Sequence, residues 1–127
     1  MKLKHNLLMT MFVLCPFTMN ATDYYTAPNA TGDGSNADSP MALTTAIDKL
    51  VAGDNLYLLD GQYDLTSTIK ISKSGTVNNM IFIGAYKNSK PILDFRKEAY
   101  GSHGVDLDAD YVHIKGITVR YAGKQGF

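Results

Sequence analysis

The stretch that decides the fold is GDNLYLLDGQY, residues 53–63. It follows a short amphipathic segment and precedes a series of short apolar segments that are rich in β-branched and aromatic residues. Clusters of glycine, asparagine, aspartate and serine separate these segments, which is the pattern of strands joined by turns. The stretch therefore predicts the opening of an all-β architecture.

The expected strands are short and follow one another closely. They are residues 23–26, 55–59, 68–71, 80–85, 92–95, 105–107, 111–114 and 117–120. No second long helix lies among them to cover a parallel sheet in the doubly wound manner. Two architectures remain, an antiparallel sandwich or barrel and a right-handed parallel β-helix.

One short helix is expected just before residues 53–63. Ser39 is a suitable N-cap and Pro40 a suitable first helical residue, and Gly53 supplies a stop signal. The apolar residues recur at three- and four-residue spacing, which places them on one face: Leu43, Ala46, Ile47 and Leu50. A helix this short needs another element against which to bury that face.

The helix and the spacing of similar segments favour the solenoid. Residues 81–83 and 112–117 lie about one to one and a half coils apart for repeats of twenty-odd residues. The first coil of a solenoid exposes strand edges and an apolar interior, which a capping helix would cover. We therefore predict an all-β, right-handed parallel β-helix with an N-terminal capping helix. It is expected to comprise about four coils.

The end of the chain falls within this pattern. Phe127 is expected to be the first inward residue of a following strand. We therefore expect residues 22–127 to be the cap and first coils of an incomplete β-helix domain. Such a polypeptide, produced alone, is expected to aggregate because its last strands have no partners.

Residues 1–21 have the layout of a secretory signal peptide. Lys2 and Lys4 precede an apolar run over residues 7–17, and small and polar residues follow, with cleavage expected after Ala21. The run is too short to span a bilayer as a helix. The protein is therefore expected to be secreted, to the periplasm, the cell surface or the medium.

Composition narrows the function classes further. The only cysteine, Cys15, lies inside the signal, so the mature chain would contain no disulfide. Leu14 before it argues against lipid attachment. The chain has 12 basic and 12 acidic residues, and this balance gives no indication of a nucleic-acid partner.

Several motifs, in this order, resemble polysaccharide lyase family 9. They are Tyr24 to Asn29, Gly32-Asp33-Gly34-Ser35, Ser39-Pro40, Gly53 to Leu58, Gly61-Gln62-Tyr63, Ile81 to Tyr86, Lys90 to Phe95 and Asp110 to Arg120. Individual motifs of this kind also occur in other β-helix proteins, including the alginate and chondroitin lyases of family 6. The resemblance covers nearly all of the chain after the signal.

The resemblance implies a secreted, monomeric enzyme that splits pectic polyuronate, either homogalacturonan or rhamnogalacturonan, by β-elimination. It also implies a calcium cofactor and a lysine base, both supplied after residue 127. We therefore assign no catalytic, cofactor-binding or metal-binding residue to this chain and expect it to be inactive alone. A β-helix lyase of alginate or a glycosaminoglycan, and a non-enzymatic glycan-binding protein or adhesin, remain alternatives.

A few residues of this chain are candidates for a metal ligand or a catalytic base, and each also has a purely structural explanation. Asp106, Asp108 and Asp110 alternate and could gather around calcium, but solvated positions and a turn explain them better. His103, in a loop, and His113, pointing out of a coil, could each be a base, although surface histidines are usually not catalytic.

Other candidates concern binding. Lys115, Arg120 and Lys124 could form a basic strip that attracts a polyuronate. Tyr111 and Tyr121 could stack on sugars, although packing between coils is the usual role of aromatic residues. Turn chemistry accounts for the remaining polar residues, which are Asn29, Asp33, Asn36 and Asp38.

Overall fold

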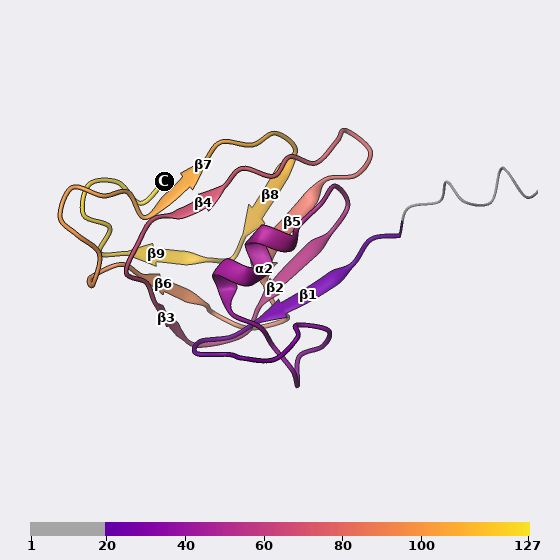
Figure 1. The fold of residues 1–127 in the computed structure, drawn as a ribbon, viewed down its shortest axis with the longest axis horizontal. Helices are drawn as coiled ribbons and strands as arrows, with labels where there is room; N and C mark the ends of the chain where they lie inside the picture. Colours follow the sequence, from indigo (N-terminus) through magenta and orange to yellow (C-terminus); the bar gives the residue numbers. More distant parts are fainter. Residues whose placement is uncertain (1–19) are drawn as a thin grey trace, which may run out of the picture.

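The structure, a computed structural model, describes residues 20–127. In that range the chain forms short strands and a single helix (Figure 1). The elements, in chain order, are β1 (Asp23–Thr26), α2 (Leu43–Lys49), β2 (Asn55–Leu58), β3 (Gln62–Asp64), β4 (Ile69–Ile71), β5 (Ile81–Ala85), β6 (Ile92–Asp94), β7 (Val105–Leu107), β8 (Val112–Lys115) and β9 (Thr118–Arg120). All of the strands except β3 overlap segments that the sequence predicts.

The strands form three parallel sheets, with the orders β1-β2-β5-β8, β3-β6-β9 and β4-β7. Each strand pairs with a strand of the neighbouring coil rather than with the next strand in the chain. The sheets surround α2 on three sides in Figure 1. This arrangement confirms the right-handed parallel β-helix, and the parallel pairing excludes the antiparallel sandwich or barrel.

The coils are longer than predicted. Register partners on neighbouring coils lie between 26 residues (Ile92 and Thr118) and 36 residues (Ile69 and Val105) apart, so a coil takes about thirty residues on average rather than twenty-odd. The described residues therefore make about three turns, not about four. Only the first sheet has a fourth strand, because β1 adds a rung before the first complete coil.

The helix begins later than predicted. Its N-cap is Ala42, which makes no side-chain capping hydrogen bond, instead of Ser39. The residues before it are engaged elsewhere, since the carbonyls of Ser39 and Pro40 accept the N–H groups of Gly34 and Gly32. The N–H of Met41 donates to the carbonyl of Tyr25. This pairing with the loop and with β1 prevents residues 39–41 from forming a first helical turn.

The predicted apolar face of the helix is confirmed. Its four residues are buried: Leu43, Ala46, Ile47 and Leu50. They pack in one cluster with the inward side chains of the strands, such as Leu56 and Leu58 of β2 and Ile81 and Ile83 of β5. The helix thus caps the interior beside the first coil, as expected of an element too short to be stable alone.

Residues 53–63 join the helix to this interior. Asp54 is 1% exposed, and its carboxylate accepts the N–H groups of Val51 and Thr22, each at 3.0 Å. Gly53 has φ +92, a conformation that favours glycine, in the turn between helix and strand. The Tyr63 hydroxyl lies within hydrogen-bonding distance of the carbonyls of Thr26 and Leu59, and burial raises the pKa of this hydroxyl.

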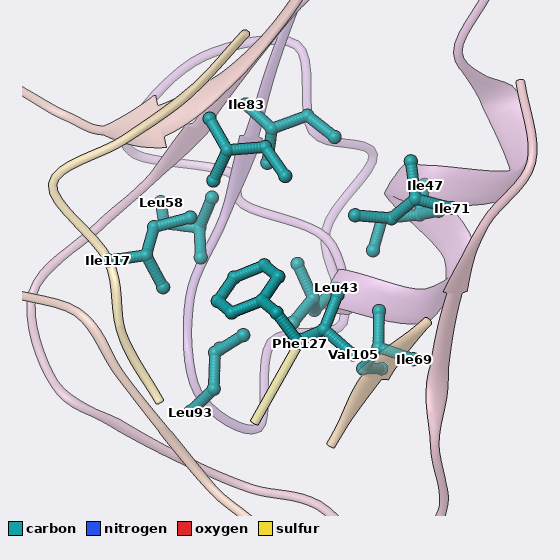
Figure 2. A pocket seen from close by; sticks show the side chains of 11 residues that line it. Leu43, Ile47, Leu58, Ile69, Ile71, Ile83, Leu93, Val105, Ile117 and Phe127 are labelled. Atoms are coloured by element: carbon teal, nitrogen blue, oxygen red, sulfur yellow. The ribbon is translucent and has the colours of Figure 1, made fainter. Parts of the chain in front are cut away.

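The other end of the solenoid exposes apolar side chains. Leu107 stacks on Ile71 but is 45% exposed, because among residues 20–127 no further strand covers this rung. Leu107 shares the inward-facing register of the buried Ile71. Phe127 points into the interior as expected, among Leu43, Leu93 and Ile117 (Figure 2), yet 60% of it is exposed.

The predicted signal peptide falls almost entirely on residues 1–19, outside the described residues. Its apolar run and Cys15 belong to this segment. Across residues 20–127, no helix has the length and apolar character that crossing a membrane requires.

Candidate functional site

The main candidate site is a hollow on the outer face of the β1-β2-β5-β8 sheet. Its volume is about 420 Å³. Its lining comes from β5, β8 and the turns that follow them: Phe82, Ala85, Lys87, Ser89, His113, Lys115 and Gly116. We call this set the sheet hollow.

Strand alternation explains which side chains line the sheet hollow. Ile81 and Ile83 of β5 point into the core, so Phe82 points outward, where its register partner is His113 of β8. Gly84 comes next on the outer face, opposite Lys115. A Cβ on Gly84 would lie 2.5 Å from Cζ of Phe82 and 2.7 Å from the Lys115 carbonyl oxygen. The glycine therefore leaves the space that the Phe82 ring occupies.

The sheet hollow is cationic. Lys87 and Lys115 are exposed, and neither has a carboxylate within salt-bridge distance among residues 20–127. The Lys87 ammonium lies 4.9 Å from the centre of the Tyr86 ring. Two ammonium groups without acidic partners favour an anion at this place.

An aromatic row leads across the same face to the sheet hollow. Tyr25 of β1 and Tyr57 of β2 have ring centres 5.5 Å apart, and Tyr57 lies 5.8 Å from Phe82. Phe82 in turn meets His113 of β8 edge to face at 5.6 Å. Tyr86 joins the row beside Tyr25, at 5.4 Å. The row thus contacts all four strands of the sheet.

A second polar cluster lies on the β3-β6-β9 sheet, and each of its cations is paired with a carboxylate. Asp94 is 1% exposed, and its carboxylate accepts Nε of Arg120 at 2.9 Å and the Arg96 guanidinium at 3.2 Å. Lys97 pairs with Asp64 on the neighbouring coil at 3.2 Å. We interpret this cluster as a clamp between coils rather than a binding site, because its cations already have partners.

The charges around Asp94 predict a pH-dependent stability. Burial opposes ionisation, but the N–H of Arg96 and the guanidinium groups of Arg120 and Arg96 together hold the pKa of Asp94 below its usual range. A lowered pKa stabilises the folded state at pH above the usual carboxyl value, about 3.9, and this stabilisation is lost as the pH falls below it. We expect Asp94→Asn to lower the urea midpoint at pH 7, with the difference from wild type shrinking toward pH 2.5.

Circular dichroism in urea at each pH measures this difference. Equal midpoints for Asp94→Asn and wild type at pH 7 would contradict the clamp. A difference that stays constant down to pH 2.5 would show that the charge of Asp94 is not its cause.

The structure does not gather the aspartates that the sequence singles out. Asp106, Asp108 and Asp110 are exposed along β7 and the turn after it. Asp108 and Asp110 use their N–H groups to contact the preceding coil, at the Ile71 carbonyl and Ser74 Oγ. Residues 20–127 contain no group of three or more His, Cys, Asp or Glu side chains able to hold a metal ion. The three aspartates therefore do not form the carboxylate cluster that a calcium site would use.

The two candidate histidines lie apart, His103 in the loop before β7 and His113 in β8. His103 bridges Gln125 beside β7, and its carbonyl accepts the Thr68 hydroxyl. His113 is exposed on the outer face of β8, as predicted, and lines the sheet hollow. Neither is within hydrogen-bonding distance of a carboxylate side chain in the described part of the chain, so no general base with an orienting partner is formed there.

The predicted basic strip is not formed. Lys115 lines the sheet hollow, Arg120 is bound to Asp94 on another sheet, and Lys124 lies in the last loop. Of the two candidate tyrosines, Tyr121 stacks against the Arg96 guanidinium, 4.4 Å from its ring centre. Tyr111 forms the turn before β8 with φ +55.

The N-terminal polar residues form turns, as predicted. Asp33 accepts the N–H and the hydroxyl of Ser35, which lowers the pKa of Asp33. Asn36 accepts the N–H of Asp38, and Asn29 adopts φ +56.

Sequence reasoning missed five members of the sheet hollow: Phe82, Ala85, Lys87, Ser89 and Gly116. Alternation around Ile81 and Ile83 was enough to place Phe82 outside. Lys87 and Ser89 lie in a segment whose residue types predict only a turn. Their position beside β8 depends on the pairing of β5 with β8, which is one coil later in the chain. That long-range register leaves no local signal.

A family model and several relatives match the chain. The family described as "Pel9A-like, right handed beta helix region" matches residues 24–127. The chain is 38% identical over 116 residues to "Pectate lyase L" of Paenibacillus polymyxa (strain SC2), covering 86% of this chain and 25% of that protein. It is 37% identical over 97 residues to "Pectate lyase L" of Thermoclostridium stercorarium, covering 73% of this chain and 8% of that protein.

A solved structure agrees with these relatives. The crystal structure of pectate lyase Pel9A superposes with a TM-score of 0.74 and 27% sequence identity, over 87% of this chain and 30% of that one. The chain thus spans about a quarter or less of the length of the two relatives named above.

Proposed function

Because the chain belongs to the Pel9A-like right-handed β-helix family, and the resemblance to polysaccharide lyase family 9 is confirmed, we propose that it is part of a lyase acting on pectic polyuronate. The pectate lyases among its relatives support a substrate of the pectate type, and rhamnogalacturonan stays a second pectic candidate. The observation that carries the proposal is the sheet hollow, whose two ammonium groups have no carboxylate within salt-bridge distance among residues 20–127. An acidic polymer is the ligand that this charge favours.

The proposed reaction is a β-elimination. A base removes the C5 proton beside the uronate carboxylate, the C4–C5 double bond forms, and the C4–O bond breaks. The departing oxygen then takes up a proton. The first step needs the carboxylate to be neutralised, which is chemistry that calcium supplies when bound.

Residues 20–127 contribute binding and support to this reaction rather than chemistry. They form no metal-binding group, and neither histidine has an orienting carboxylate. We propose that the calcium ligands and the base belong to residues outside this chain. The signal-like residues 1–21 support export of the whole protein.

Ultraviolet absorbance of unsaturated uronides tests the proposal. A longer polypeptide that continues beyond residue 127 is expected to release them from polygalacturonate or rhamnogalacturonan in the presence of calcium and to stop when calcium is chelated. Residues 22–127 alone are expected to give no product above the uncatalysed rate.

A substrate panel separates the alternatives. Activity of the longer protein on alginate or chondroitin but not on pectic polymers would replace the pectic assignment. Binding without product on every polymer would favour a glycan-binding protein. Calcium-dependent product from residues 22–127 alone would show that the catalytic groups lie within this chain after all.

A further inference from the structure

We propose that the outer face of the β1-β2-β5-β8 sheet is a remote subsite for an acidic polysaccharide. In this subsite Lys87 and Lys115 pair with carboxylates, and the aromatic row lies against the sugar rings. The inference rests on the proposed function for the identity of the polymer. The inference goes beyond the proposed function because it places a substrate-binding surface on coils that provide no catalytic group.

The lining of the sheet hollow points to an anionic ligand. It contains two lysines, a histidine and a serine hydroxyl, and no carboxylate. Asp60, on the turn between β2 and β3, accepts the N–H of Lys90 at 2.8 Å and does not line the sheet hollow. At the far end of the face Asp23 accepts the Asn55 amide at 2.8 Å. The face is therefore cationic at β8 and not at β1.

The aromatic row gives the direction of the bound polymer. Tyr25, Tyr57 and Phe82 lie on successive strands, so their line crosses the sheet from coil to coil. Each of these rings is half-buried and presents its remaining surface outward. Aromatic rings offer apolar surface to sugar rings as they do to other apolar groups. A polymer on this row lies along the solenoid axis and reaches the sheet hollow at the β8 end.

The orientation suits a subsite that extends a catalytic cleft on later coils. The β8 end carries the cations, and β8 is the last strand of this sheet within residues 20–127. A polymer held here would continue over whatever rungs follow β8. Contacts remote from the reacting bond strengthen binding of long substrates and leave short ones unaffected.

The test is charge reversal in the longer, active protein. Lys87→Glu with Lys115→Glu is expected to weaken binding of polygalacturonate about tenfold when measured by affinity electrophoresis with calcium chelated. Exposed ion pairs are individually weak, but reversal also adds repulsion. The same variant is expected to raise KM on the polymer by a larger factor than it lowers kcat, and to reduce activity on the polymer more than activity on a trisaccharide. Lys87→Arg with Lys115→Arg is expected to retain wild-type binding.

Lys73→Glu is the matched control. Lys73 is exposed on the loop after β4, outside the proposed surface, so its reversal makes the same change of charge elsewhere. The proposal is overturned if Lys73→Glu reduces the affinity for polygalacturonate by as much as each reversed lysine of the double variant does. It is also overturned if the double variant binds like wild type, or if wild type itself fails to bind polygalacturonate.

The two proposals fail in distinguishable ways. Absence of lyase product from the wild-type protein on every polyuronate would refute the proposed function. The calcium-free binding measurement would still decide whether Lys87 and Lys115 form an anion-binding surface. Conversely, full activity with unchanged binding and KM in the double variant would refute only the subsite.

Discussion

Replacing Asp54 with Ala is expected to lower the free energy of unfolding by about 1–3 kcal/mol for each backbone N–H that it leaves without a partner. The carboxylate of Asp54 is 1% exposed and accepts two such groups, from Val51 after the helix and from Thr22 before β1. These two bonds fasten the capping helix and β1 to the start of β2. The urea midpoint followed by circular dichroism, at a concentration where light scattering shows monomers, measures the loss.

Two variants sharpen this result. Asp54→Asn keeps one acceptor oxygen and is expected to lose about half as much stability. Asp48→Ala removes an exposed carboxylate from the solvent side of α2 and is expected to change stability by less than about 0.5 kcal/mol. If Asp54→Ala behaves like Asp48→Ala, the junction between helix and coil is held by apolar packing alone.

The sequence predicts the architecture well where the signal is local. Alternation of apolar residues identifies nearly every strand, and the three- and four-residue spacing from Leu43 to Leu50 identifies the face that α2 buries. The strand β3 was missed because Gln62, Tyr63 and Asp64 follow the turn signal Asp60-Gly61 directly. Only pairing with β6, a coil later, makes this segment a strand.

The start of the helix shows the same limit. Ser39-Pro40 is a good helix start by its residue types, and Ala42 is a poor cap. The carbonyls of Ser39 and Pro40 nevertheless bond to Gly34 and Gly32, because the loop over residues 27–38 folds back on them. Tertiary hydrogen bonds override the local preference.

The candidate site could be predicted only in part. His113 and Lys115 were expected on the outside of β8, and they are. Lys115 and Arg120 are close in sequence, but the turn at Gly116, with φ +74, sends them to different sheets. Lys87 joins Lys115 through coil register instead. Proximity along a solenoid chain is therefore a poor guide to a shared surface, and position on neighbouring rungs is a better one.

The open end of the solenoid leads to the second prediction with a large effect. Residues 22–127, produced alone, are expected to self-associate, because Leu107 and Phe127 expose apolar surface beside the last strands β7, β8 and β9. Replacing both residues with Gln is expected to weaken this association about tenfold, since it removes apolar area but leaves the strand edges unpaired. Sedimentation velocity over a range of concentrations measures the change.

Val77→Gln serves as the control, because Val77 is 70% exposed in the loop between β4 and β5, away from this rung. It is expected to leave the association constant unchanged. A polypeptide 22–127 that stays monomeric at all concentrations would show that the exposed rung does not drive contact between copies. Equal weakening by Val77→Gln would indicate general surface hydrophobicity instead. If only the double variant at the rung dissociates the complexes, the surface that associates is the one on which a following coil would stack.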